Sequence, residues 1–361
     1  MGDEAIIRVM LVDDSAIIRG LVSRALKEAD DMLIVGTATD GEQAIALVGE
    51  YKPDVIVLDI EMPVMDGLTA LPQLLKRAPN AHVIMASTLT ERNAEISLRA
   101  LSLGASDYLT KPSAKQSDAT EQFFRDLKEK IRSLAHVKAE RNAALMQALA
   151  PAPAPKAAVV PQGPAPSTVK HVEAIAIASS TGGPQALQTV FAQLKNRASR
   201  VPIFITQHMP PTFTAILADH IGKAAGVPSF EAKDGQKVEA GSIYLAPGDF
   251  HMQPERKGGD VIIRLNQNPP ENFCRPAADP MLRSLAGIYG NQLLVAVLTG
   301  MGHDGLAGAQ NVVAAGGEVI AQDQATCVVW GMPRAVTEAK LVTNTLPLDS
   351  VAEYLARAVT R

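Results

Sequence analysis

The chain has 361 residues, of which 47% are hydrophobic and 20% charged, so it has the composition of a globular protein and the length for two domains. Lys and Arg (34) nearly balance Asp and Glu (38) at a formal net charge of -4, so no basic excess points to nucleic acid or a membrane surface. No apolar run reaches membrane-spanning length, and the N-terminus does not resemble a signal peptide. The two cysteines, Cys274 and Cys327, form no C-x-x-C pair and are expected to be reduced core thiols. We therefore expect a soluble, cytoplasmic protein without membrane insertion or bound nucleic acid.

The first part of the sequence alternates strand patterns with helical patterns. The predicted strands are 8–12, 33–36, 55–59, 82–86 and 106–109, and the helices between them include 17–29 and 91–103. The first and third strands are continuous apolar runs, which is typical of strands buried on both faces. The alternation predicts a doubly wound α/β domain with a parallel sheet.

Polar residues follow the carboxyl ends of four of these strands. Asp13 and Asp14 follow the first, Asp59 ends the third, Ser87 follows the fourth and Lys111 the fifth. Ligands bind at this edge of an open α/β sheet, and three converging carboxylates favour a hard divalent cation such as Mg²⁺. Taken alone, the first two carboxylates are better explained as loop residues before a helix cap. The agreement of four strand ends favours the cation site.

At these residues the segment resembles the response-regulator receiver family over about residues 6 to 125. The motifs are Val12-Asp13-Asp14-Ser15, Leu58-Asp59-Ile60-Glu61-Met62-Pro63-Val64-Met65-Asp66-Gly67, Ser87, and Tyr108-Leu109-Thr110-Lys111-Pro112. The resemblance implies a flavodoxin-like fold in which Asp59 is phosphorylated. It implies that Mg²⁺ is held by Asp13, Asp14, Asp59 and the backbone carbonyl of Glu61, and that the switch residues are Ser87, Tyr108 and Lys111. Phosphorylation adds charge and acceptors, which Ser87 and Lys111 would move in to satisfy.

An amphipathic helix and a proline-rich segment come next. Apolar residues at helical spacing predict a helix over 120–149 whose apolar face packs on one of the domains. Residues 150–168, APAPAPKAAVVPQGPAPST, cannot form a core and should be extended. We therefore divide the chain into a receiver domain at 6–125, a linker at 126–169 and a second domain at 170–361.

The second domain is again predicted as doubly wound α/β, a Rossmann-like parallel sheet. Its predicted strands are 173–178, 202–206, 243–245, 292–298 and 318–321, and its helices include 185–194, 213–221, 280–289 and 306–315. A short hairpin between residues 251 and 264 is expected to turn at Lys257-Gly258-Gly259-Asp260.

Three strands of this domain lead to residue types used in nucleophilic catalysis. The run Ile175-Ala176-Ile177-Ala178-Ser179-Ser180-Thr181-Gly182-Gly183-Pro184 ends a buried strand before a helix start. It delivers Ser180, while the next strands lead to His208 and Asp304, and parallel strands would place all three at one edge. They could serve as nucleophile, general base and orienter of the base. Their order along the chain and the lack of G-x-S-x-G differ from α/β-hydrolases.

Other interpretations of these residues stay open at this point. Gly300-Met301-Gly302-His303-Asp304-Gly305 matches a dinucleotide fingerprint, with Asp323 as the ribose-binding carboxylate, although its position late in the domain counts against it. Ser180 taken alone fits a helix cap, and His208 taken alone fits a buried structural histidine. The rival bases are His251 and His303. Arg275 could steer an acidic substrate surface or pair with Asp279.

The second segment resembles the catalytic domain of the CheB chemotaxis protein-glutamate methylesterase family from about residue 170 onward. The motifs are Ser179-Ser180-Thr181-Gly182-Gly183-Pro184, Thr206-Gln207-His208-Met209-Pro210, Tyr244-Leu245-Ala246-Pro247-Gly248, Cys274-Arg275-Pro276, Leu298-Thr299-Gly300-Met301-Gly302-His303-Asp304-Gly305 and Gly331-Met332-Pro333. The resemblance implies Ser180 as nucleophile, His208 as base and Asp304 as its orienter. Ala178-Ser179 replaces the family's common Gly-Ala, which makes Ser179 a rival nucleophile, but register with the following Thr-Gly-Gly favours Ser180.

We therefore predict a phosphorylation-activated serine esterase that hydrolyses glutamate γ-methyl esters of methyl-accepting chemotaxis receptors. Deamidation of receptor glutamines, phosphorylation by a chemotaxis histidine kinase and a role in adaptation are implied by the resemblance. Mg²⁺ is expected in the receiver only, and backbone N–H groups near Thr181 or Met301 are expected to support the oxyanion. The receiver is expected to cover the Ser180 edge until Asp59 is phosphorylated. A nucleotide-binding oxidoreductase and a receiver with a DNA-binding output are the alternative classes.

Overall fold

The computed structural model describes residues 6–88, 90–111, 120–135, 171–195, 197 and 200–359. It divides into two compact units, Met1–Ala150 and Pro151–Arg361, and each is described by itself. The predicted proline-rich segment at 150–168 lies outside the described residues, as does the part of the predicted helix after residue 135. Among the residues described, no helix is long and apolar enough to cross a membrane.

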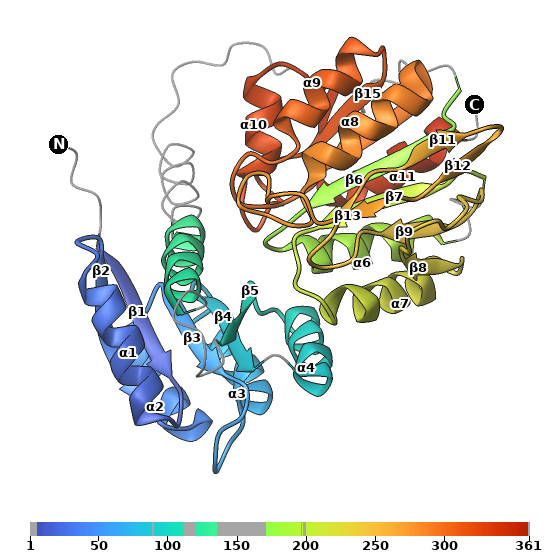
Figure 1. The fold of residues 1–361 in the computed structure, drawn as a ribbon. Helices are drawn as coiled ribbons and strands as arrows, with labels where there is room; N and C mark the ends of the chain where they lie inside the picture. The colour runs from blue at the N-terminus through green and yellow to red at the C-terminus, as the bar shows by residue number, and fades with distance from the viewer. Residues whose placement is uncertain are drawn as a thin grey trace, which may run out of the picture. The chain divides into compact units, whose positions relative to one another are not determined.

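The first unit is a five-stranded parallel sheet in the order β2-β1-β3-β4-β5 (Figure 1). Its elements are β1 (Ile7–Val12), α1 (Ala16–Lys27), β2 (Met32–Ala38), α2 (Gly41–Tyr51), β3 (Val55–Asp59), α3 (Gly67–Arg77), β4 (His82–Thr88), α4 (Glu91–Ser102) and β5 (Asp107–Lys111). All five predicted strands are confirmed, with ends that differ by at most two residues. Every residue of β3 is buried, which agrees with the apolar run at 55–58 that precedes Asp59.

A further helix, residues 120–135, packs on this first unit. Its core side chains Leu127, Ile131 and Leu134 are fully buried. The Arg132 guanidinium donates to both carboxylate oxygens of Asp31, at 2.6 and 2.9 Å, and Lys130 pairs with Asp107. The helix therefore runs across the boundary predicted after residue 125 and is held by the receiver unit.

The second unit is built on a seven-stranded parallel sheet in the order β16-β15-β14-β6-β7-β9-β8. Its elements up to the hairpin are β6 (Ala174–Ser179), α6 (Gly183–Leu194), β7 (Ile203–Gln207), α7 (Phe213–Ala225), β8 (Ser229–Glu231), β9 (Ile243–Leu245), β10 (His251–Met252), β11 (Glu255–Lys257), β12 (Asp260–Ile262) and β13 (Leu265–Asn266). The remaining elements are α8 (Ala278–Tyr289), β14 (Leu293–Val297), α9 (Leu306–Ala314), β15 (Glu318–Gln322), α10 (Met332–Glu338), β16 (Asn344–Leu346) and α11 (Leu348–Val359).

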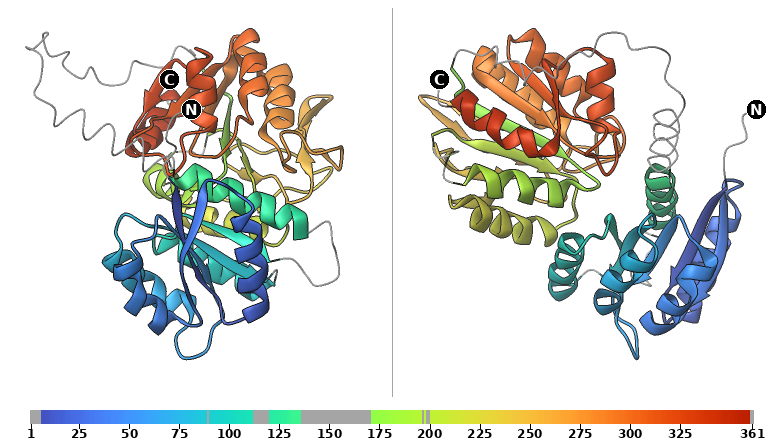
Figure 2. Two further views of the ribbon diagram at one scale, coloured as in Figure 1. Left: turned by 90° about the vertical axis from the view of Figure 1, so that its left-hand side faces the viewer. Right: turned by 180° about the vertical axis from the view of Figure 1, so that it is seen from behind.

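Helices cover both faces of this sheet, as Figures 1 and 2 show. The helices α6, α7 and α11 pack together on one face, and α8, α9 and α10 pack on the other. Every residue of the central strands β14, β6 and β7 is buried. The predicted hairpin is present as β11 and β12, which pair Lys257 with Asp260 across the turn. Both units thus have the doubly wound α/β fold that the strand and helix patterns predict.

Candidate functional site

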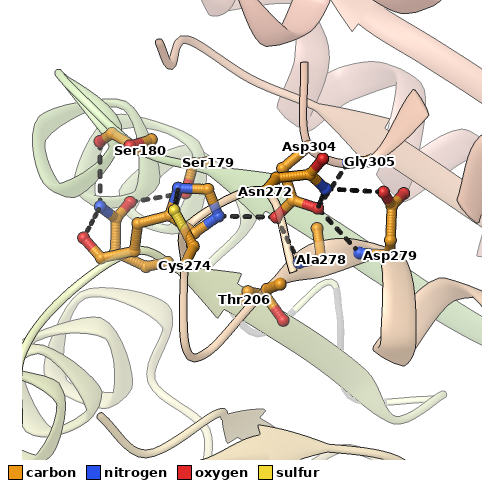
Figure 3. A network of polar contacts seen from close by, with 12 residues as sticks. Ser179, Ser180, Thr206, Asn272, Cys274, Ala278, Asp279, Asp304 and Gly305 are labelled. Carbon is orange, nitrogen blue, oxygen red and sulfur yellow. Dashed lines mark hydrogen bonds and ion pairs between the residues drawn. The ribbon is translucent and has the colours of Figure 1, made fainter. Parts of the chain in front are cut away.

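The strands β14, β6 and β7 are neighbours, and the three predicted catalytic residues follow their carboxyl ends. Ser180 comes directly after β6, His208 directly after β7, and Asp304 lies in the loop between β14 and α9. The sheet topology therefore brings together residues that are far apart in the sequence. Figure 3 shows how the side chains around this edge connect.

The side chain of Gln207 ties the first two strand ends to each other. Its Nε2 donates to the backbone oxygens of Ser180 at 2.9 Å and His208 at 3.2 Å, and its Oε1 accepts from Ser179 Oγ at 2.7 Å (Figure 3). Ser179 is fully buried, so its hydroxyl is a structural group in this bond. A Cβ on Gly183 would lie 1.9 Å from Gln207 Oε1, so only glycine lets α6 begin against this amide.

The imidazole of His208 is held by the carboxylate of Asp304. The distance from Nε2 to Oδ2 is 2.7 Å. Asp304 is itself 1% exposed, and its carboxylate accepts from the backbone N–H groups of Ala278 and Asp279 at the start of α8. It accepts as well from the N–H of Gly305 and the side-chain amide of Asn272 (Figure 3). A helix N-terminus suits a carboxylate because its N–H groups lack partners within the helix.

These contacts shift the pKa values of the pair in opposite directions. Burial alone would raise the pKa of Asp304, but the bond and charge of His208 and the backbone donors lower it to about 2. Burial alone would lower the pKa of His208, but Cys274 and Asp304 outweigh this and raise it. The site therefore stabilises an imidazolium next to a carboxylate.

The other ring nitrogen of His208 faces a thiol. Cys274 Sγ lies 3.4 Å from Nδ1, and the Ser180 hydroxyl makes no hydrogen bond to the ring in this structure. The prediction that both cysteines lie in the core is wrong for Cys274, which is half-buried, and holds for Cys327. Catalytic hydrogen bonds are often formed only once substrate is bound, so a missing Ser–His bond does not by itself exclude the residue.

The glycine-rich loop after β14 supplies Asp304 and packs against β6. A Cβ on Gly300 would lie 2.9 Å from the Cβ of Ser180, so this glycine permits close packing of two strand ends. Asp323, the residue expected to bind a ribose, accepts from the N–H and hydroxyl of Thr326 and thereby closes a turn. The glycine-rich loop after β14 therefore serves in this fold to pack two strand ends against each other.

The two rival bases, His251 and His303, and the residue Arg275 each have surroundings of their own. His251 is 1% exposed, with Nδ1 accepting from the N–H of Ala277 and Nε2 next to a backbone oxygen, whereas His303 is exposed. The suggested pairing of Arg275 with Asp279 is wrong, because Arg275 binds the carboxylate of Asp249 through Nε and Nη2. The Asp279 carboxylate instead accepts a hydrogen bond from the backbone N–H of Gly308, near the start of α9.

The receiver unit has an acidic cluster at the carboxyl edge of its own sheet. Oxygen atoms of Asp13, Asp14 and Asp59 lie within 4.8 Å of one another. Lys111 Nζ contacts Asp13 Oδ2 at 2.7 Å and Asp59 Oδ2 at 2.8 Å. Burial raises the pKa of Asp59 to about 6, and Lys111 only partly opposes it. Carboxylate oxygens packed this closely are the donor set that a hard cation such as Mg²⁺ prefers, so the cluster fits the ion.

The predicted switch residues lie on the neighbouring strands. Ser87 is buried on β4 with its hydroxyl 3.3 Å from that of Ser97, and Tyr108 is buried on β5, where burial raises its pKa. Both strands continue the sheet beside the strand that carries Asp59. The side chain of Glu61, whose carbonyl is the further predicted ligand, is exposed.

Several residues of the catalytic edge were not found by sequence reasoning. Asn272 Nδ2 donates to both Asp279 and Asp304 at 2.9 Å, and Thr299 Oγ1 donates to the carbonyl of Thr181 while accepting from the N–H of Val329. Gln207 stood next to His208 in the predicted motif but had no assigned role. Only its place beside a predicted strand end could have marked it.

These two units define a class of protein, a response-regulator receiver joined to a separate α/β domain with Ser, His and Asp at one edge of its parallel sheet. The chain belongs to the CheB methylesterase family. The model of that family, CheB methylesterase, matches residues 175–355, and the model of the response regulator receiver domain matches residues 9–120.

Relatives of known name match the chain over almost its whole length. A protein-glutamate methylesterase/protein-glutamine glutaminase 1 of Paramagnetospirillum magneticum is 49% identical over 98% of this chain and 97% of the relative. The protein-glutamate methylesterase/protein-glutamine glutaminase of Nitrobacter hamburgensis is 49% identical over 99% of this chain and 95% of the relative. The CheB methylesterase catalytic domain of Thermotoga maritima has a TM-score of 0.50 and 39% identity, covering 51% of this chain and 97% of that one.

Proposed function

We propose that this protein is a serine esterase that hydrolyses glutamate γ-methyl esters on methyl-accepting chemotaxis receptors and deamidates receptor glutamines. Its relatives carry the name protein-glutamate methylesterase/protein-glutamine glutaminase, which agrees with both activities. The observation that carries the proposal is the His208–Asp304 pair at 2.7 Å on strand ends next to Ser180. A dinucleotide-binding or DNA-binding function has no comparable support. Membership of the family and the geometry of the site point to the same chemistry.

Ser180 is the nucleophile in this proposal. Within the described part of the chain its hydroxyl has no hydrogen-bond partner and the residue is half-buried, whereas Ser179 is fully buried and bonded to Gln207. The hydroxyl oxygen attacks the ester carbonyl, and the proton passes to Nδ1 of His208, because Nε2 is committed to Asp304. The imidazolium then protonates the departing methanol, and water releases the glutamate. Glutamine would follow the same route with ammonia as the leaving group.

Asp304 and nearby backbone groups complete the site. The carboxylate stabilises the imidazolium and holds the ring in one orientation, which the lowered pKa of Asp304 supports. Backbone N–H groups at Thr181 and Met301 are proposed to stabilise the oxyanion, because Thr181 directly follows Ser180 and Met301 follows Gly300, which packs against Ser180. No cofactor is needed for this chemistry.

The receiver unit is proposed to control the esterase. Asp59 accepts a phosphoryl group from a chemotaxis histidine kinase, and Asp13, Asp14, Asp59 and the Glu61 carbonyl would hold Mg²⁺. The ion supplies charge neutralisation for phosphoryl transfer when bound. Lys111 already contacts the Asp59 carboxylate. A phosphoryl group added to Asp59 would therefore compete with the present carboxylate contacts for the ammonium group of Lys111. Ser87 and Tyr108 on the next strands are the proposed switch residues, and activation of the esterase is the proposed outcome.

Substitution of the nucleophile tests the catalytic proposal. Ser180→Ala should lower methanol release from methylated receptor by at least about 10³-fold, since the attacking oxygen is lost. Ser179→Ala is the matched variant: it removes a structural bond to Gln207 and should retain far more activity than Ser180→Ala. Equal activity of Ser180→Ala and the unaltered protein, measured with folded samples, would rule out Ser180 as nucleophile.

A further inference from the structure

The catalytic edge contains a second nucleophile that the esterase reaction does not use. The thiol of Cys274 lies 3.4 Å from Nδ1 of His208, and Nε2 of the same ring is bound to Asp304 at 2.7 Å (Figure 3). Cys274, His208 and Asp304 thus form an array of nucleophile, base and orienting carboxylate. Activated cysteines have this arrangement, in which a ring oriented by a third group faces the sulfur.

The loop that carries Cys274 is fixed on both sides. Cys274 and Glu271 exchange two backbone hydrogen bonds, at 2.9 and 3.2 Å, and the Glu271 carboxylate is bound by Arg283. On the other side Arg275 is anchored to Asp249. The sulfur is therefore held next to the imidazole by the loop, and the half-buried side chain leaves a route for a small reagent.

We propose that Cys274 is a site of reversible oxidation by hydrogen peroxide, and that this oxidation switches the esterase off. The proposal rests on the proposed function only for its second part, the loss of esterase activity. The reactivity of the thiol follows from its own surroundings, because the sulfur lies 3.4 Å from Nδ1 of a histidine ring that Asp304 orients, which is the arrangement of activated cysteines.

The chemical step involves the thiol and one molecule of peroxide. The proton of Cys274 passes to His208, and the thiolate sulfur attacks one peroxide oxygen. The S–O bond forms as the O–O bond breaks, and the departing hydroxide takes the proton from the imidazolium to leave as water. The sulfur is oxidised by two electrons to a sulfenic acid, and peroxide is reduced. Two equivalents of a small thiol restore Cys274 through a mixed disulfide, releasing water and the disulfide of the small thiol.

Oxidation at this position would remove the general base. His208 has one nitrogen bound to Asp304, so Nδ1 is the only nitrogen left for the proton of Ser180. A sulfenic oxygen on Cys274 would stand next to this nitrogen and offer it a stronger hydrogen-bond partner than the thiol. The ring would then be bonded on both sides, and Ser180 could not transfer its proton.

The other cysteine provides a matched comparison within the same chain. Cys327 is buried, and burial, together with the charge of Asp323, raises the pKa of its thiol. An inaccessible and protonated thiol reacts slowly with peroxide. We therefore expect oxidation to be selective for Cys274.

The full-length protein is treated with graded hydrogen peroxide, and sulfenic acid is trapped with dimedone and located by mass spectrometry. Cys274 should be labelled at least ~10-fold faster than Cys327. Methanol release should fall in proportion to the labelled fraction and return after dithiothreitol. In Cys274→Ser and Cys274→Ala, peroxide should leave each variant's own untreated rate unchanged, whereas Cys327→Ser should remain sensitive; the variants also separate thiol oxidation from oxidation of methionines.

Each alternative result has a distinct meaning. Equal labelling of both cysteines, labelling of Cys274 without loss of activity, or Cys274→Ser and Cys274→Ala variants that remain as sensitive to peroxide as the unaltered protein would overturn the proposal. If the untreated protein releases no methanol, the proposed function fails instead, and the labelling ratio still decides whether Cys274 is reactive. Should one Cys274 variant be unfolded, the other variant and the labelling of the unaltered chain provide the answer.

Discussion

At the scale of single residues, the catalytic edge depends on how one carboxylate is stabilised in the interior. Asp304 is almost fully buried, yet its pKa is lowered to about 2, because His208, Asn272 and three backbone N–H groups all donate to it. An isolated buried carboxylate would be expected to take up a proton instead. Burial lowers the pKa of His208, but Cys274 and the Asp304 carboxylate together outweigh this and raise it.

The first prediction concerns this pair. Asp304→Asn should lower the rate of methanol release by about 10³–10⁴-fold, because the imidazolium loses its stabilising charge and the ring loses its orientation. A base must be neutral to accept the serine proton, and Asp304 raises the pKa of His208. The rise of activity with pH should therefore occur at lower pH in the variant. A pH–rate profile of both proteins is the measurement, and a shift to higher pH would contradict the argument.

At the scale of secondary-structure elements, the site depends on how closely the start of α6 approaches the end of β7. Gln207 bridges the ends of β6 and β7 through hydrogen bonds to Ser179, Ser180 and His208. Gly183 lets the helix begin directly against this amide. The positions of the proposed nucleophile, Ser180, and the proposed base, His208, are thus linked by one side chain.

Replacing this glycine should disturb both stability and activity. In Gly183→Ala the new Cβ would meet Gln207 Oε1 at 1.9 Å and Ser179 Cβ at 2.9 Å. We expect a loss of about 1–3 kcal/mol in the free energy of unfolding and a fall in kcat for methanol release. Gly287→Ala, on an exposed position of α8 with no atom within 4 Å of the new Cβ, is the control and should stabilise by about 0.5–1 kcal/mol. Similar behaviour of both variants would refute the role of Gln207.

The helix over 120–135 makes a second element-scale case. Its buried residues Leu127, Ile131 and Leu134 pack on the receiver unit, as does Phe123. Ion pairs to Asp31 and Asp107 lie at its edges. We therefore assign it to the receiver unit as its last helix, whereas the sequence pattern divided it between the receiver (to residue 125) and the linker (from residue 126).

Truncation of its core tests this assignment. Ile131→Ala should destabilise the receiver by about 2–5 kcal/mol, since a fully buried side chain leaves a cavity. Calorimetry of the full-length chain should show a lower transition temperature for the receiver and an unchanged one for the catalytic unit. Glu129→Ala, on the exposed side of the same helix, should change the receiver by no more than about 0.5 kcal/mol. A shift of the catalytic transition instead would place the helix with the other unit.

At the scale of the whole molecule, two units with separate cores carry separate chemistry. The acidic cluster and Lys111 belong to the first unit, and Ser180, His208 and Asp304 belong to the second. A change at Asp59 can reach the esterase only if the two units influence each other, which is the regulatory part of the proposed function.

That coupling is tested at the receiver. A small-molecule phosphodonor with Mg²⁺ should raise methanol release by the full-length protein, and chelation of the metal should abolish the rise because the phosphoryl group could no longer be transferred. Asp59→Asn should lose the response to the phosphodonor, whereas Asp30→Asn, an exposed carboxyl in the turn after α1, should keep it. An undiminished response in Asp59→Asn would exclude this residue as the phosphoacceptor.

The sequence patterns predicted the class of both units and most of their strands. Alternating strands and helices predict parallel sheets, and apolar runs such as 55–58 and 174–178 match strands that are buried on both faces. The strands β8 and β16 were not predicted, because each has three residues and stands at the edge of the sheet. Such short segments contain too few positions for a periodic pattern.

The sequence by itself determined the residue types at the strand ends, and with them the expectation that Ser180, His208 and Asp304 meet. Only the tertiary structure decided that Asn272 lies between Asp279 and Asp304, that Gln207 links two strands, and that Cys274 faces the imidazole. The physical reason is the range of the interactions. Strand ends follow from local periodicity, whereas a contact such as that between His208 and Cys274 joins residues 66 positions apart and depends on how distant loops pack.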